Sequence, residues 1–113
     1  MTNYRPQDIV LVEFAYAENT GSKKRPALII SSYRYHQNRQ EVIVMAITSN
    51  IDRILFADTK IDKWKEAGLL YPSLVTGIVR TVKGSIILRK LGILSQRDFQ
   101  KVRENIRKAI ALC

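Results

Sequence analysis

The sequence predicts a mainly β fold of the α+β class, a small antiparallel barrel or sandwich followed by one C-terminal amphipathic helix. Short apolar runs rich in β-branched and aromatic residues follow one another without the alternating strand and helix rhythm of a parallel sheet. Helical periodicity is found only at the end of the chain. With 113 residues, 46% of them hydrophobic, the chain can support one core but not two, so we expect a single domain over residues 1–113.

The first half of the chain contains three predicted strands, at residues 8–16, 25–31 and 42–48. A turn is expected at residues 19–22, because Asn, Thr, Gly and Ser are typical turn residues. The polar segment 32–41 is expected to be a loop that joins the second and third strands as an antiparallel pair.

The second half contains three more predicted strands, at residues 53–61, 74–82 and 85–93. Between the first two of these, residues 62–67 are expected to form a short helical turn that ends at Gly68, and Pro72 prevents a helix just beyond it. The last two strands are expected to be hinged near Lys83 and Gly84.

A helix is predicted to close the chain. Ser95 precedes Asp98 by three positions, the spacing of a capping box. Apolar side chains then recur at helical spacing between Arg and Lys residues, at Phe99, Val102, Ile106 and Ile110.

The chain is strongly basic, with 19 Lys and Arg residues against 10 Asp and Glu residues and a formal net charge of +9. The excess is uneven: residues 79–94 contain four basic side chains and no acidic one, whereas residues 42–78 are neutral. A basic surface attracts the phosphates of nucleic acids, and it also attracts acidic proteins and anionic membranes. Charge therefore indicates an anionic partner without identifying it.

Membrane insertion and disulfide bonding are not expected. The longest apolar run, residues 42–47, is far shorter than the ~20 residues that span a bilayer. Arg5, Pro6 and Asp8 stand where a signal peptide would need apolar residues, so we expect a cytoplasmic protein. Cys113 is the only cysteine, which excludes an intramolecular disulfide and a cysteine-based metal cluster.

The strand pair at 25–31 and 42–48 suggests one site. If Ser31 faces Val42, Arg25 lies opposite Thr48, with Cβ atoms ~4.5–5.5 Å apart. A guanidinium fork beside a hydroxyl would suit a phosphate group, although the pair is also compatible with ordinary strand residues. One face of the pair would then be bulky and apolar, with Leu28, Ile30, Ile43, Met45 and Ile47. The other would be shallow and partly polar, with Arg25, Ala27, Ser31, Ala46 and Thr48.

The expected loop at 32–41 holds further candidates. His36 is the only side chain with an ordinary pKa near neutrality, and it is either a surface loop residue, an RNA contact or a catalytic group. Tyr33 and Tyr35 lie beside Arg34 and Arg39 and would either stack on unpaired bases or pack the loop over the sheet.

Short motifs occur in a characteristic order along nearly the whole chain: DIV at residues 8–10, GSKKRPAL at 21–28, AITS at 46–49, GL at 68–69, PS at 72–73, VRT at 79–81 and LGILS at 91–95. In this ordered series the chain resembles the MazF/PemK (Kid) family of toxin endoribonucleases from bacterial type II toxin-antitoxin systems.

The resemblance implies an SH3-like antiparallel barrel that forms a homodimer. It also implies metal-independent and cofactor-independent cleavage of single-stranded RNA by 2′-hydroxyl attack, leaving a 2′,3′-cyclic phosphate and a 5′-hydroxyl, and inhibition by a cognate acidic antitoxin. In the family the Arg of the RP step and the Thr that ends the third strand are assigned to catalysis, which points to Arg25 and Thr48. The residues expected to contact RNA are Lys23, Lys24, Ser49, Arg80 and Thr81, and Arg80 could instead form a structural salt bridge or a dimer contact.

The chain departs from the family pattern at three places. Gln7 replaces a common Gly, and the loop before Arg25 is shortened to Lys23 and Lys24. Residues 75–78 lack the Arg and Asp that some members place before the RT step. Two other functions are compatible with the sequence: a barrel that binds nucleic acid without cutting it, and a gyrase-directed toxin of the related CcdB type.

Overall fold

The computed structural model describes residues 3–15 and 21–112, and the predicted strand end Tyr16, the first two residues of the predicted turn at 19–22 and Cys113 lie outside these ranges. The elements are β1 (Asp8–Ala15), β2 (Ser22–Ile29), α1 (Tyr33–Asn38), β3 (Glu41–Thr48), β4 (Thr59–Lys60), β5 (Leu74–Lys83), the 3-10 turn η1 (Gly84–Ile86), β6 (Ile87–Ile93) and α2 (Gln96–Arg107). None of the helices in the described ranges is long and apolar enough to cross a membrane.

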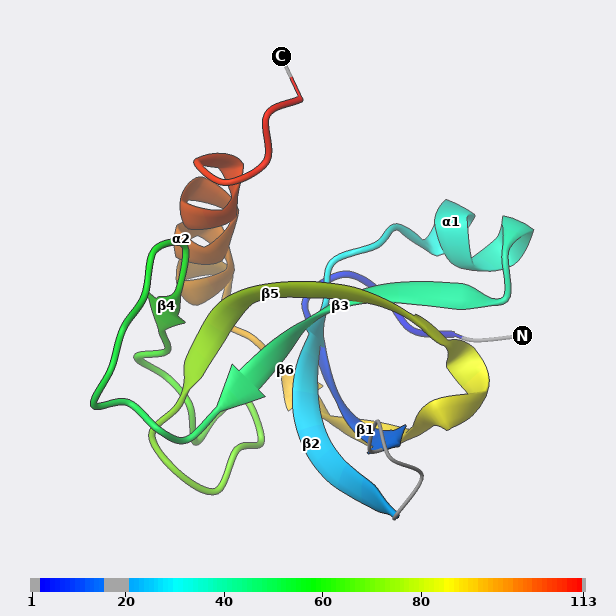
Figure 1. Cartoon of the computed structure of the whole chain (residues 1–113), viewed down its shortest axis with the longest axis horizontal. Helices are drawn as coiled ribbons and strands as arrows, with labels where there is room; N and C mark the ends of the chain where they lie inside the picture. The colour runs from blue at the N-terminus through cyan, green and yellow to red at the C-terminus, as the bar shows by residue number, and fades with distance from the viewer. Residues whose placement is uncertain (1–2, 16–20, 113) are drawn as a thin grey trace.

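The strands form one antiparallel six-stranded sheet in the order β4-β5-β3-β2-β1-β6. Figure 1 shows the sheet curling around itself, with α2 packed beside the end that carries β4. The predicted mainly β, antiparallel fold with a C-terminal helix is confirmed. The sheet is not closed into a barrel, because β4 and β6 are its two edges.

The strand predicted at residues 53–61 is wrong, since only Thr59 and Lys60 form one. Asp58 explains the difference. Its carboxylate accepts the backbone N–H of Leu55 (2.8 Å) and that of Gly77 in β5 (2.8 Å), which folds the preceding residues into a loop held against β5. These hydrogen bonds replace a sheet ladder as partners for the backbone.

The polar segment 32–41 is also not a loop, because residues 33–38 form α1. The Ser32 hydroxyl accepts the backbone N–H of Tyr35 (3.1 Å), which satisfies one of the free donors at the helix start. This capping is local, but α1 is too short to show a helical period in the sequence.

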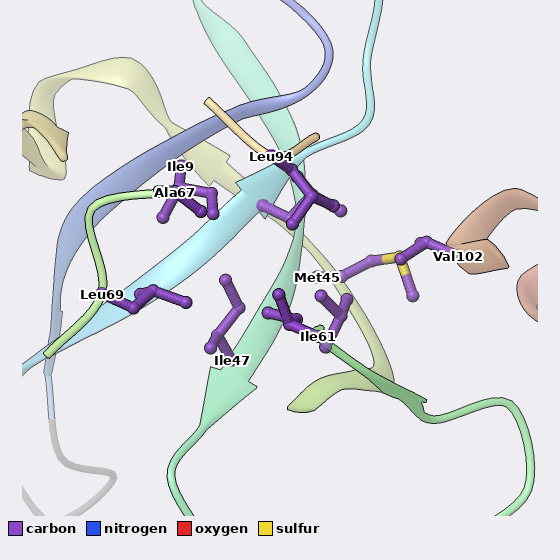
Figure 2. Packing of buried hydrophobic residues seen from close by; sticks show 10 residues of the cluster. Ile9, Met45, Ile47, Ile61, Ala67, Leu69, Leu94 and Val102 are labelled. Carbon is purple, nitrogen blue, oxygen red and sulfur yellow. The ribbon is translucent and has the colours of Figure 1, made fainter. Parts of the chain in front are cut away.

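Two apolar clusters lie on opposite faces of the sheet. The first is packed under α2, and Figure 2 shows Met45, Ile61 and Val102 meeting there. The second lies on the concave face of the curled sheet and contains Val10, Val12, Ala27, Ile29, Val42, Val44, Val82 and Ile87. The core was predicted on the bulky face of the β2/β3 pair, but the face predicted to be shallow and partly polar also carries a buried apolar cluster, because the curl of the sheet covers it.

The turn before β5 is held by a close approach of two backbone segments, at Gly68 and at Gly92. The Gly68 N–H donates to the Lys65 carbonyl (3.0 Å) and the Leu69 N–H to the Trp64 carbonyl (3.1 Å), the pattern of a helix C-terminus, so the predicted helical turn is confirmed. Gly68 has a φ of +87°, and a Cβ atom there would lie 2.1 Å from the carbonyl oxygen of Leu91. Only glycine fits this position.

Gln7, which replaces a glycine common in the resembling family, has a φ of +86°. This region of backbone conformation favours glycine. Three hydrogen bonds hold Gln7 there: its N–H donates to Ile29 (2.9 Å), its side-chain amide donates to Leu94 (2.7 Å), and its carbonyl accepts from the Leu94 N–H (2.9 Å). Gln7 thus ties the end of β2 to the start of α2.

The predicted C-terminal helix is confirmed as α2, which ends at Arg107, so Ile110 lies beyond it. The Ser95 hydroxyl accepts the N–H of Asp98 (3.1 Å). The buried carboxylate of Asp98 accepts the N–H groups of Asp62 (3.2 Å) and Lys63 (3.0 Å) and lies 3.3 Å from the ammonium of Lys101. Asp98 therefore joins α2 to the turn that precedes Gly68.

Burial by itself raises the pKa of Asp98, but the hydrogen bonds from Lys63 and Asp62 and the Lys101 ammonium outweigh it, so the pKa is lowered. A lowered folded-state pKa stabilises the protein above the unfolded value of about 3.9, and this stability is lost as the pH falls through the folded-state pKa.

Asp98→Asn is therefore expected to lower the free energy of unfolding at pH 7 by about 2 kcal/mol, because the amide nitrogen of Asn cannot accept one of the two partly buried backbone N–H groups that the carboxylate accepts. Urea unfolding at pH 7 and at pH 3 measures the effect, which should decrease as the pH falls below the unfolded value. Glu66→Gln is the control, since the Glu66–Lys63 pair is exposed and 3.9 Å apart. Equal losses for both variants would contradict the role of Asp98.

Candidate functional site

Arg25 and Thr48 lie at the same end of the neighbouring strands β2 and β3. The predicted register of this pair is confirmed, because Ala27 lies opposite Ala46 and the next two pairs follow in step. The ladder ends at Ala27 and Ala46, so the two candidate residues lie just beyond its last pair. Figure 1 shows β2 and β3 diverging toward this end.

The basic residues Arg25 and Arg80 share one face of the sheet. Arg25 is paired with Val12 of β1. Arg80 is paired with Val44 of β3. Both valines belong to the concave cluster, and residues directly opposite in an antiparallel pair share a face. Thr48 lies on this face as well, four residues after Val44 in the same strand.

Lys23 lies on the same face as Arg25, two residues earlier in β2, and Phe14 lies between it and Arg80. The guanidinium carbon of Arg80 lies 4.7 Å from the centroid of the Phe14 ring, although β5 and β1 are not neighbours in the sheet. Phe14 in turn is paired with Lys23. We call Lys23, Arg25 and Arg80 the basic face. Sequence analysis missed Phe14; its two-residue spacing from the apolar Val12 was the available signal.

Two other predicted RNA contacts do not join the basic face. Lys24 is paired with Glu13 and points to the opposite face of the sheet. Thr81 is paired with Ile43 and also lies on that opposite face. Ser49, the first residue after β3, is exposed next to Thr48.

The hydroxyl group of Thr48 is oriented by its own backbone turn. Its oxygen accepts the N–H of Asn50 (3.1 Å). A hydroxyl has one proton to donate besides its acceptor sites, so the proton of Thr48 can point toward a ligand oxygen. Arg25 is exposed, and no ion pair within the described residues involves it. Both groups can thus donate to an anion at the open strand ends.

β5 is irregular beside the site, where its register with β3 shifts between Met45 and Ile47. The Thr76 hydroxyl donates to the carbonyl of Ala46 (2.7 Å), and Gly77 donates to Asp58. Residues 75–78 lack the Arg and Asp that some members of the resembled family have there, and the carboxylate that contacts this stretch comes from Asp58 instead. Here backbone hydrogen bonds occupy both carboxylate oxygens of Asp58, so its role is structural.

His36 is not at the site. It is buried in α1, which precedes β3, whereas Thr48 ends β3, ~20 Å away along the strand. Its Nδ1 lies 2.9 Å from the carbonyl oxygen of Tyr4 and its Nε2 lies 2.5 Å from the hydroxyl of Ser31. Because a carbonyl oxygen only accepts, Nδ1 is the donor there. His36 joins three segments, and the expectation of a loop residue is wrong.

Tyr33 and Tyr35 are half-buried in the same helix. The guanidinium of Arg5 lies 4.8 Å from the centre of the Tyr33 ring, and that of Arg39 lies 5.5 Å from the centre of the Tyr35 ring. The chain's own arginines therefore cover ring faces that were candidates for stacking on bases.

A large hollow in the described part of the chain, with a volume of about 1230 Å³, lies near α1 and η1, away from Arg25 and Thr48. Its charges are largely paired, because Lys90 lies 3.1 Å from Asp8 and Arg39 lies 2.6 Å from Glu41. The smaller hollow, about 320 Å³, follows Thr48 and is lined by Ser49, Ile51, Tyr71 and Pro72. The cations of the basic face, which form no ion pair among the described residues, and the hydroxyl of Thr48 make the candidate site, rather than the larger hollow.

In the part of the chain that the structure describes, no three His, Cys, Asp or Glu side chains are grouped to hold a metal ion.

Comparisons with known proteins agree with the predicted family. The family described as "PemK-like, MazF-like toxin of type II toxin-antitoxin system" matches residues 5–110. A search of curated proteins by sequence found no match.

Several solved structures share the fold. A MazE-MazF complex from Deinococcus radiodurans has a TM-score of 0.81 at 14% identity, with 100% of both chains covered. An endoribonuclease in complex with its cognate antitoxin from a mycobacterial species has a TM-score of 0.78 at 14% identity, with 97% of each chain covered. The Mycobacterium tuberculosis toxin MazF-mt6 has a TM-score of 0.70 at 24% identity, covering 88% of this chain and 94% of its own.

The family match extends over nearly the whole chain and includes both strand ends that carry Arg25 and Thr48. This chain belongs to the PemK-like, MazF-like toxin family of type II toxin-antitoxin systems.

Proposed function

We propose that this chain is a metal-independent endoribonuclease that cuts single-stranded RNA, acting in the cytoplasm as the toxin of its toxin-antitoxin pair. The observation that carries the proposal is the juxtaposition of Arg25 and Thr48 on one face of the sheet with Lys23 and Arg80. An open, basic face with two directed donors suits a polymer of phosphates better than a small molecule.

Arg25 and Thr48 act on the scissile phosphate. The 2′-oxygen of the preceding ribose attacks phosphorus and loses its proton. The bond between phosphorus and the 5′-oxygen breaks, and the departing 5′-oxygen takes up a proton. Negative charge grows on the non-bridging oxygens as the fifth bond forms. The Arg25 guanidinium stabilises that charge, and the Thr48 hydroxyl donates to one of these oxygens. The products are a 2′,3′-cyclic phosphate and a 5′-hydroxyl.

The other RNA contacts follow from their positions. Lys23 and Arg80 bind phosphates beside the scissile one, because they share its face. Ser49 contacts the RNA next to the phosphate that Thr48 binds. Lys24 and Thr81 would reach only RNA that passes around to the opposite face of the sheet.

Incubation of the purified protein with a long unstructured RNA in EDTA tests the proposal. Discrete fragments that end in a cyclic phosphate are expected. Binding without cutting would instead support a nucleic-acid-binding protein without catalysis. Inhibition of DNA gyrase without RNA cutting would support a toxin of the CcdB type.

We also propose that residues 1–113 act as one toxin domain, that the chain forms a homodimer, and that a small acidic antitoxin binds it. The +9 net charge favours rapid capture by an anionic chain, and the neighbours of similar fold include toxins solved with antitoxins. A two-fold dimer would join two basic faces into a longer surface for several nucleotides.

Lys23→Glu is expected to weaken binding of the antitoxin and of RNA by about tenfold and to reduce the salt dependence of both, because the two ligands would share the basic face. Titration at two salt concentrations measures this. Arg97→Glu is the matched control, with the same change in net charge at an exposed position on α2. An antitoxin complex that still binds RNA with unchanged affinity would contradict the shared surface.

A further inference from the structure

The smaller hollow begins at the residue after Thr48. Ser49, Ile51, Tyr71 and Pro72 line it, and its walls are mostly apolar, with no charged side chain among them. Its volume of about 320 Å³ is at the lower end of the range for ligand sites, ~300–1,000 Å³, which suits one flat ring system rather than a chain segment.

Both walls of the hollow are held by hydrogen bonds. On one side, the turn in which Thr48 accepts the N–H of Asn50 sets the path of the chain through Ser49. On the other side, the hydroxyl of the buried Ser73 donates to the carbonyl of Tyr71 (2.7 Å). The backbone of Tyr71 is thus fixed while its side chain stays 63% exposed. An exposed aromatic ring on a fixed backbone is a ready stacking surface.

We infer that this hollow, the Tyr71 hollow, binds the base of one of the two nucleotides that flank the scissile phosphate, with that base stacked on Tyr71. The inference rests on the proposed function. Ser49 is one residue from Thr48, about 3.3 Å along the strand, so a base attached next to a phosphate held by Thr48 reaches the hollow. Uncharged apolar walls accept a base and disfavour a phosphate. Ser49, which lines the hollow, has a hydroxyl that can hydrogen-bond to a base edge.

The test uses an RNA with 2′-deoxyribose before the scissile phosphate, so that it binds without being cut, and with the fluorescent base 2-aminopurine placed at one position at a time. Stacking quenches this base. The wild-type protein is expected to quench the label at one of the two flanking nucleotides. Tyr71→Ala is expected to abolish that quenching and to lower affinity about tenfold, whereas Tyr71→Phe retains both.

Leu70→Ala is the matched control, because Leu70 is the preceding residue, is 82% exposed and does not line the hollow. It should leave quenching unchanged. Quenching that persists in Tyr71→Ala, or that occurs only away from the scissile phosphate, overturns the inference while RNA cutting by the wild-type protein leaves the proposed function standing. If the wild-type protein does not cut the unmodified RNA, the proposed function fails and the inference fails with it.

Discussion

Arg25→Ala is expected to lower the rate of RNA cleavage by about 100- to 1000-fold, the usual cost of losing one donor directed at charge that develops in the transition state. The guanidinium is exposed at the open end of β2, so its removal leaves neither a cavity nor an unpaired buried group. The loss should therefore fall on the rate of bond cleavage rather than on folding. Single-turnover cleavage measures that rate, and thermal unfolding checks the fold.

Thr48 allows a sharper version of this experiment. Thr48→Val keeps the shape of the side chain but removes the hydroxyl, and a loss of similar size is expected. Thr48→Ser keeps the hydroxyl and should restore most of the rate. Arg97→Ala, at an exposed position on α2, is the matched control for the loss of an arginine. Cleavage by Arg25→Ala at nearly the wild-type rate would disprove the assignment.

Replacing only the ribose before the scissile phosphate by 2′-deoxyribose should stop cleavage altogether. The 2′-hydroxyl is tethered beside the phosphorus atom, so its attack is intramolecular and has an effective concentration that an external water must obtain from the enzyme. The phosphate contacts from Arg25 and Lys23 do not involve this hydroxyl, so affinity should change little. Cleavage assays and binding titrations on the matched pair of RNAs separate the two effects.

Two further observations belong to this experiment. EDTA should not change cleavage of the unmodified RNA, and the product should end in a 5′-hydroxyl. Cutting of the substituted RNA at a comparable rate, or a product with a 5′-phosphate, would show that another nucleophile attacks. The protein would then be a ribonuclease with a different mechanism.

Local patterns in the sequence were enough to predict much of this molecule. The strands near residues 8–16, 42–48 and 74–82 and the helix that begins after Ser95 are all present. These predictions rest on alternation, β-branched composition and a capping residue, which act over a few neighbouring residues. The register of β2 and β3 was an assumption, because the side-chain pattern alone allows more than one alignment of two such strands, and the structure bears it out.

Long-range contacts explain the errors. The polar segment around His36 became a helix because Ser32 caps it and because His36 is held by Tyr4, 32 residues earlier. The expected strand before Thr59 became a loop because Asp58 bonds to Gly77. Tyr4 and Gly77 both lie too far along the chain from His36 and Asp58 for sequence periodicity to relate them, whereas the Ser32 cap is local.

The sequence by itself determined most of the strands, the basic charge and the ordered motifs of the family, from which Arg25 and Thr48 were predicted as site residues. Only the tertiary structure decided which basic residues share a face with them. The sheet curls so far that Arg80 of β5 reaches Phe14 of β1 across the concave cluster, which brings Arg80 toward the face of β2 that carries Lys23 and Arg25, while Lys24 lies on the other face. Strand alternation sets the face of each side chain, but sheet curvature sets which distant faces meet, and curvature depends on packing throughout the core.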